Sequence, residues 1–274
     1  MKIDDMMYEI VLPLVCFKKR RGIVFFALKL HNHPGALERV SSILADANVN
    51  IEHGVHSISM NGKYGYWIFL ADFSKARIGI EDILRRIKAL DDVEEADFGI
   101  KWIENVGIPP FNVRVTFTGH KVVLWRSIWY ACFFNAILER FGCGGAAFMY
   151  HVGKEAGKLV AEWWIKVASK EKDPGVLLDL ALNLWKILGW ISEYKIMKVD
   201  SKKFEFIVRL YDLYSCEPFR CKKEEAMGHF ARGMLTGYLE GIINKPLTSI
   251  ERKCIAKGDS YCEIVIEKDQ EELS

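Results

Sequence analysis

Residues 249–266 read Ser249-Ile-Glu-Arg-Lys-Cys254-Ile-Ala-Lys-Gly258-Asp-Ser-Tyr-Cys262-Glu-Ile-Val-Ile266. Two runs of strand-forming composition flank a turn centred on Gly258, which predicts a β-hairpin. Cys254 and Cys262 each lie four positions from Gly258, so a register centred there places them opposite each other on one side of the sheet. Directly opposed residues have Cβ atoms roughly 4.5–5.5 Å apart. The two thiols are therefore predicted to lie close together.

Three interpretations of this cysteine pair stay open. The side chains can be small apolar groups in a core, ligands of one metal ion, or a redox pair. Tetrahedral zinc needs more than two ligands, and the chain offers further donors upstream at Cys216, Cys221 and His229. These five residues form the candidate metal site, in which zinc would have a structural role.

Composition excludes several classes of protein. The 274 residues can form one large or two ordinary domains. A net charge of +2 gives no general attraction for nucleic acid, and no apolar run approaches the roughly 20 residues of a membrane span. The seven cysteines are odd in number and scattered, which indicates reduced thiols and a cytoplasmic location. We therefore expect no direct nucleic-acid contact and no membrane span.

The first half of the chain predicts a β-α-β-β-α-β order over residues 23–103. Strand-like runs and helical spacing alternate along it, and Asn61-Gly62 is a strong hairpin signal between the second and third strands. The runs are strands at 23–31, 49–60, 64–73 and 93–103, and helices at 36–47 and 80–90. This is the order of the ferredoxin-like split βαβ fold.

The segment Leu30-His-Asn-His-Pro-Gly-Ala-Leu37, followed by a helix and then Asn48-Val-Asn-Ile51, resembles the opening of an ACT domain. That family consists of small regulatory modules that pair side by side and often bind amino acids. The resemblance covers about residues 23–103 and implies a ligand site at Asn32, His33, Gly35, Ala36 and Leu37. Gly35 lets the backbone approach a ligand, and the N–H groups at the helix start favour a carboxylate. The alternative is a domain that only dimerises.

The remaining boundaries follow from composition. Residues 1–22 are expected to be an N-terminal extension, and residues 104–112, with Pro109-Pro110, a linker. A second domain is expected at 113–267 and an acidic tail at 268–274.

Within the second domain the patterns predict strands at 113–117, 190–199 and 203–211 and helices at 123–141, 146–168, 175–188 and 224–243. The helix at 123–141 is apolar nearly all round, which is typical of a helix that is buried or lines a cavity. Gly153 and Gly157 share one face of the next helix, which indicates close helix packing or backbone left open beside a ligand. The candidate pocket residues are aromatic: Trp125, Trp129, Phe133, Phe148 and Trp164.

A second resemblance rests on the closing segments. Gly228-His-Phe-Ala-Arg-Gly233-Met-Leu-Thr-Gly237, Glu251-Arg-Lys-Cys254, Gly258-Asp259 and Tyr261-Cys262 together resemble the 4-vinyl reductase domain family. The resemblance covers about residues 113–267 and implies an apolar internal cavity, with a nearby zinc in several members. Cys254 and Cys262 match the family's closing cysteine pair. Gly228 and His229 stand where a third family cysteine is usual, so either His229 or Cys221 would replace that ligand.

These features predict an α+β protein. A ferredoxin-like βαββαβ domain is followed by a mixed α/β ligand-binding domain, which the second resemblance implies to be similar to TRAPP-type and haem NO-binding folds. We expect a cytoplasmic, homodimeric sensor or regulatory protein. Its second domain would bind a small apolar or aromatic ligand, its first domain would bind an amino acid or dimerise, and its output would pass through a downstream regulatory protein.

The sequence carries no nucleophile–base pattern, phosphate loop or dinucleotide fingerprint. It therefore favours a non-enzymatic protein, and neither haem nor nucleotide is expected. Two alternatives remain. One is a scaffold or assembly protein with a TRAPP-like fold, which a fully packed second domain would favour. The other is an accessory component of a vinyl reductase.

Overall fold

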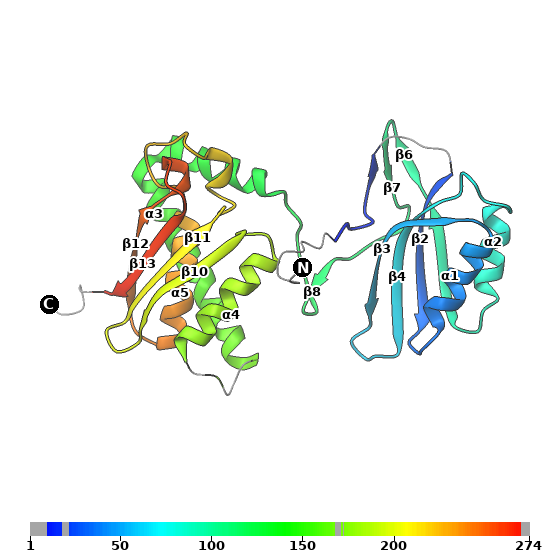
Figure 1. Cartoon of the computed structure of the whole chain (residues 1–274), viewed down its shortest axis with the longest axis horizontal. Coiled ribbons are helices and arrows are strands. Elements are labelled where there is room, and N and C mark those ends of the chain that lie inside the picture. The colour runs from blue at the N-terminus through cyan, green and yellow to red at the C-terminus, as the bar shows by residue number, and fades with distance from the viewer. Residues whose placement is uncertain (1–9, 18–21, 168–170, 172, 270–274) are drawn as a thin grey trace, which may run out of the picture. The chain divides into compact units, whose positions relative to one another are not determined.

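The structure, a computed structural model, describes residues 10–17, 22–167, 171 and 173–269. The chain divides into two compact units, with the boundary between Val123 and Leu124. Each unit has its own hydrophobic core and is described by itself (Figure 1). Among the described residues, no helix is long and apolar enough to cross a membrane. The expected acidic tail lies outside the described residues from position 270 onward.

The first unit is built on a four-stranded antiparallel sheet with the strand order β3-β4-β2-β5. Its elements are β2 (Ile23–His31), α1 (Ala36–Asp46), β3 (Asn50–Ile58), β4 (Tyr64–Asp72), α2 (Ile80–Lys88) and β5 (Val93–Gly99). Figure 1 shows both helices on one face of the sheet. Element order and strand order are those of the ferredoxin-like split βαβ fold, which confirms the prediction for this region.

Alternation along β2 decides which side chains enter which core. Phe26 and Leu28 are buried with Val40 of α1 and Ile87 of α2 on the helix-covered face. Phe25 points to the opposite face, because successive strand residues alternate between faces.

A second, three-stranded sheet packs on that opposite face, with the order β1-β7-β6. Its strands are β1 (Cys16–Phe17), β6 (Lys101–Ile103) and β7 (Val106–Ile108). The predicted linker at 104–112 is therefore part of the first unit, because β7 pairs with β1 from the predicted N-terminal extension. The predicted strand at 93–103 is two strands, since Gly99, with φ 147°, redirects the chain between β5 and β6.

A short hairpin ends the first unit. β8 (Thr116–Phe117) pairs with β9 (His120–Lys121), and both lie before the boundary at Leu124. The strand expected at 113–117 thus pairs locally and does not join the sheet of the second unit. The second unit begins at Leu124 rather than at the expected residue 113.

The second unit has a four-stranded antiparallel sheet with the order β10-β11-β13-β12. Its elements are α3 (Ser127–Val167), α4 (Pro174–Ile187), β10 (Glu193–Asp200), β11 (Glu205–Tyr211), the 3-10 turn η2 (Glu217–Phe219), α5 (His229–Ile243), β12 (Leu247–Lys253), the 3-10 turn η3 (Ile255–Lys257) and β13 (Cys262–Lys268). Phe206, Val208 and Leu210 of β11 are buried in a core with side chains of α4 and α5, as their alternation predicts.

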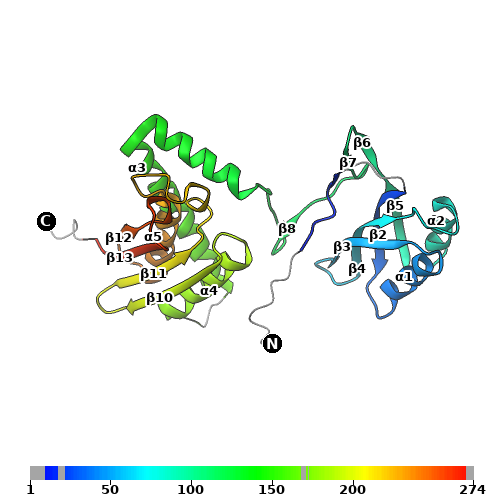
Figure 2. The same cartoon turned by 45° about the horizontal axis from the view of Figure 1, so that its top comes forward.

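Helix α3 is broken at Gly142, whose φ of 52° and ψ of −131° are not helical. The break separates an N-terminal arm, residues 127–141, from a longer part, residues 143–167. It falls between the two helices predicted at 123–141 and 146–168. Figure 2 shows the two parts of α3 running in different directions.

Four glycines bring the longer part of α3 against α5. Gly153 and Gly157 come from α3, and Gly233 and Gly237 from α5. A Cβ atom placed on Gly153 would lie 2.2 Å from the carbonyl oxygen of Phe230, far inside van der Waals contact. The glycine spacing therefore serves close helix packing, one of its two predicted roles.

Candidate functional site

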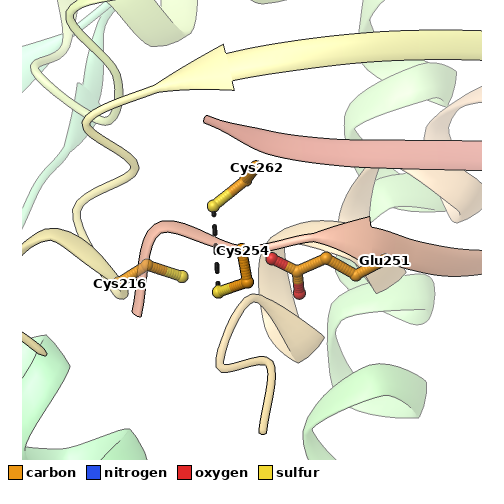
Figure 3. A group of neighbouring side chains, drawn as sticks. All are labelled: Cys216, Glu251, Cys254 and Cys262. Carbon is orange, nitrogen blue, oxygen red and sulfur yellow. Dashed lines mark hydrogen bonds between the residues drawn. The ribbon is translucent and has the colours of Figure 1, made fainter. Parts of the chain in front are cut away.

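Four ionisable side chains meet where the closing strands of the second unit join (Figure 3). They are Cys216, Glu251, Cys254 and Cys262, and their ligand atoms all lie within 4.8 Å of one another. The Sγ atoms of Cys254 and Cys262 are 4.0 Å apart, on either side of the turn that holds Gly258. Cys216, fully buried, comes from the turn that begins η2.

A β-bulge brings Glu251 into this group. On a regular strand, residues three apart point to opposite faces, so Glu251 and Cys254 would separate. The β12–β13 register shifts between Glu251 and Lys253, and the extra residue returns both side chains to one side. One carboxylate oxygen of Glu251 accepts a hydrogen bond from the backbone N–H of Gly228 at 3.0 Å, and the other is buried without a hydrogen-bond partner in the described part of the chain.

The cluster concentrates acidic groups away from water. Hydrogen bonds from the thiols of Cys216 and Cys262 lower the pKa of Cys254. Burial, together with the negative charge at Cys254, raises the pKa of Glu251. Four such groups can all ionise only if a cation compensates them, because like charges at this distance disfavour one another.

The donor set fits a zinc ion. Zinc binds thiolate sulfur at ~2.3 Å in tetrahedral geometry, which places two sulfurs ~3.8 Å apart. The observed separation of 4.0 Å between Cys254 and Cys262 is close to that value. Asp259 accepts a hydrogen bond from the backbone N–H of Cys254 at 2.8 Å and so supports the ligand-bearing turn. The orphaned oxygen of Glu251 supplies a fourth donor atom.

Two predicted ligands lie outside this group. Cys221 is exposed, although its backbone N–H bonds to the carbonyl of Ile255. His229 begins α5, and its Nδ1 has no hydrogen-bond partner among the described residues. Burial lowers the pKa of His229, which keeps the ring neutral. The structure thus brings together three of the five candidate residues and adds Glu251.

An aromatic cavity of about 580 Å³ opens beside the arm of α3. Its walls come from the arm, from the longer part of α3, from the turn after α4 and from the start of α5. The lining residues are Trp125, Ser127, Tyr130, Phe133, Phe134, Ile137, Phe148, Met149, Val152, Leu188, Gly189, Trp190, Tyr214 and Phe230. Hydroxyl-bearing Ser127, Tyr130 and Tyr214 add polar groups to an otherwise apolar surface. This composition is typical of a site for a small apolar molecule.

Three of the five predicted pocket residues line this cavity: Trp125, Phe133 and Phe148. Trp129 does not line it and is 52% exposed. Trp164 is sixteen residues beyond Phe148, ~24 Å along the helix, and packs with Leu177 and Tyr238 in a separate cluster. The helical spacing of Tyr130, Phe134 and Ile137 marks the pocket-facing side of the arm and was the available signal for the residues not predicted.

The first unit has a smaller cavity, of about 210 Å³, at the loop between β2 and α1. All five predicted residues line it: Asn32, His33, Gly35, Ala36 and Leu37. Gly35 has a φ of 91°, a conformation that glycine adopts without strain, and it caps the start of α1 without a side chain.

Asp92 organises this loop and was not predicted. Its carboxylate contacts His33 Nε2 at 2.5 Å and pairs with the guanidinium of Arg39. The hydrogen bond from Arg39, and then that from His33, lowers the pKa of Asp92. Asp92 immediately precedes β5, where sequence periodicity gives no sign that it faces the loop.

Comparisons with known proteins agree with the two-unit organisation. A family model described as ACT domain matches residues 24–92, and the model of the 4-vinyl reductase domain matches residues 211–268. The chain therefore carries an N-terminal ACT domain and a C-terminal 4-vinyl reductase domain. The second match includes Cys216, Glu251, Cys254 and Cys262 but does not reach the α3 arm.

Two curated relatives come from Methanocaldococcus jannaschii. The uncharacterized protein MJ0150 is 30% identical over 125 residues, which are 46% of this chain and 66% of that protein. The uncharacterized protein MJ1642 is 28% identical over 85 residues, which are 31% of this chain and 52% of that protein. The matches thus span about two thirds of the first relative and half of the second.

Among solved structures, the phenol-responsive sensory domain of the transcription activator PoxR with phenol is similar at 16% identity. The TM-score is 0.47, and the match covers 54% of this chain and 77% of that one. A trafficking protein particle complex subunit 3 from Naegleria fowleri, covalently bound to palmitic acid, is similar at 13% identity and a TM-score of 0.41. That match covers 53% of this chain and 93% of that one.

Proposed function

We propose that this protein is a ligand-responsive regulator whose second unit binds a small aromatic molecule. The aromatic cavity of about 580 Å³ carries the proposal. A fully packed second unit would instead have favoured a scaffold. Drug-sized pockets of this kind have volumes of ~300–1,000 Å³, apolar walls and few polar groups. One or two fused rings with a single hydroxyl suit the aromatic walls and the hydroxyls of Ser127, Tyr130 and Tyr214.

The same proposal gives zinc a structural role. Cys216, Glu251, Cys254 and Cys262 would hold the ion, which would supply a fixed tetrahedral crosslink between the η2 turn and the closing hairpin. Tyr214, two residues before Cys216, lines the cavity. The metal site would therefore support one wall of the pocket.

The ACT unit offers a second candidate function, amino-acid binding at the β2–α1 loop. The observation that favours it is the cavity of about 210 Å³ beside Gly35 and the start of α1, which has no side-chain cap. Helix starts favour a carboxylate group. Signal output would pass to another protein, and the cytoplasmic location stays a prediction.

Isothermal titration of the purified full chain with 2-naphthol tests the aromatic site. We expect binding by the wild type and a loss of roughly tenfold in affinity for Phe133→Ala, as about 1.4 kcal/mol of aromatic contact is removed. Leu159→Ala is the matched control, because Leu159 is an exposed apolar residue of α3 that does not line the cavity. Equal affinities for the two variants would remove the proposal.

A further inference from the structure

The α3 arm is apolar on its outer side as well as on its pocket side. Trp125, Ile128, Trp129, Cys132 and Ala136 follow helical spacing on the outer side, and all are exposed. Tyr130, Phe134 and Ile137 face the cavity instead. From residue 122 to residue 138, Arg126 is the only charged residue. A surface helix normally places polar side chains on its outer side, so this face is suited to a further contact.

The aromatic cavity is open next to this face. Phe133 and Phe148 line it, yet 52% and 62% of their surfaces remain exposed. Small-molecule sites bury ~70–90% of the ligand surface. A ligand seated here would therefore remain partly in water unless another surface covers the arm and the cavity mouth.

We propose that the arm of a second copy of this chain supplies that cover, in an antiparallel pair that completes the aromatic site. The inference rests on the proposed function, since it names the partner that closes the proposed pocket. The pair has a two-fold axis between Cys132 and Phe133, and each arm contributes aromatic side chains at the mouth of the other copy's cavity.

The sequence of the arm is complementary to itself in this arrangement. Arg126 lies opposite the partner's Glu139, and Trp129 lies opposite the partner's Ala136, so charge meets opposite charge and a large side chain meets a small one. Within the chain, Glu139 contacts Asn135 and Lys223 through Oε1, so its other carboxylate oxygen can accept from a further donor. A parallel pair would instead place Arg126 beside a second Arg126.

The exposed area is of the size that a dimer needs. An aromatic side chain buries roughly 150–250 Å², so half-exposed Trp125, Trp129, Phe133 and Phe148 leave on the order of 400 Å² to be covered. Stable interfaces bury ~800 Å² per partner. The four aromatic residues thus supply about half of such an interface, and Ile128 and Val152 extend it.

Site-specific crosslinking of the full chain tests the arrangement, because an ACT domain can dimerise by itself and total mass would not distinguish the two contacts. Cys132 is exposed and lies next to the proposed axis. A short bismaleimide should join Cys132 to the partner's Cys132, as identified by peptide mass spectrometry. Cys143→Ser, which removes another exposed cysteine of α3, should leave this product unchanged.

Trp129→Glu places two buried charges near the axis and should reduce the Cys132 crosslink at least tenfold, with a drop of about tenfold in 2-naphthol affinity. Met197→Glu is the control, because Met197 is a similarly exposed apolar residue on β10, and both signals should persist. No Cys132 product in the wild type, or an undiminished product in Trp129→Glu, overturns the inference.

The two proposals fail in different ways. If 2-naphthol binds and depends on Phe133 while Cys132 does not crosslink, the pocket stands and the second copy is excluded as its cover. If Cys132 crosslinks and Trp129→Glu abolishes the product while 2-naphthol does not bind, the interface stands and the aromatic site is withdrawn.

Discussion

Glu251 Oε2 accepts a hydrogen bond from the backbone N–H of Gly228, at 3.0 Å. Gly228 is the residue from which α5 starts, and two residues later Phe230 stacks on Phe134 with ring centroids 5.4 Å apart. Both rings line the aromatic cavity. The candidate metal site and the candidate ligand site are therefore joined through the first turn of α5, so the geometry of one affects the other.

Replacing one thiol should remove the metal. We expect Cys262→Ser to purify without zinc, measured by inductively coupled plasma mass spectrometry, whereas the wild type carries one zinc per chain. An ion that saturates its site a hundredfold contributes ~2.7 kcal/mol, so the unfolding temperature of the second unit should fall by about 5–10 °C.

Cys221→Ser is the informative control for that experiment. Cys221 is exposed and lies outside the four-residue group, so this variant should retain full zinc content and wild-type stability. Loss of zinc in Cys221→Ser would show that the loop after η2 supplies a ligand instead of Glu251.

Glu251→Gln should separate the two tasks of this side chain. The amide oxygen still accepts from Gly228, but the negative charge opposite the ion is gone. Outer-shell changes alone cost ~10–100-fold in metal affinity, so we expect a loss of at least tenfold in competition with a chelator, while the variant remains folded by circular dichroism. Unchanged affinity would mean that three thiolates hold the ion without Glu251.

The glycine contact between α3 and α5 should not tolerate a methyl group. In Gly153→Ala the new Cβ would lie 2.2 Å from the carbonyl oxygen of Phe230, and overpacking of this kind costs ~1–3 kcal/mol or more. Gly144→Ala, on the same helix, has nothing within 4 Å and should be neutral or stabilising by up to ~1 kcal/mol. Urea denaturation of both variants checks the contrast, and equal stabilities would contradict the close crossing.

The stability of the ACT unit should depend on pH through Asp92. Arg39 and His33 hold the pKa of this carboxyl below its ordinary value of 3.8, so the folded state keeps it ionised at a pH where the unfolded chain protonates it. Its stabilisation is complete above about pH 3.8 and is lost as the pH falls through the lower, folded pKa. Asp92→Asn should therefore unfold at a lower temperature than the wild type at pH 7, with the gap closing below pH 3.8.

Differential scanning calorimetry from about pH 7 to about pH 2.5 follows that gap. Asp91→Asn is the control, since the neighbouring Asp91 is exposed. A gap of constant size across the range would show that Asp92 acts through packing and not through its charge.

The sequence by itself determined the features that depend on local periodicity. Alternation in β2 and β11 placed Phe26 and Phe206 in their cores, and Asn61-Gly62 marked the turn between β3 and β4. The four-residue spacing on either side of Gly258 placed Cys254 beside Cys262, because a hairpin register follows from its turn.

Only the tertiary structure decided which distant groups complete each site. A one-residue bulge turns Glu251 toward the thiols, and no sequence period signals it. The linker and its pairing with β1, the exclusion of Cys221, and the place of Trp129 on the outer side of the arm depend equally on contacts between segments far apart in the chain. Periodicity specifies which face a side chain takes on its own helix or strand, whereas packing between elements specifies what that face meets.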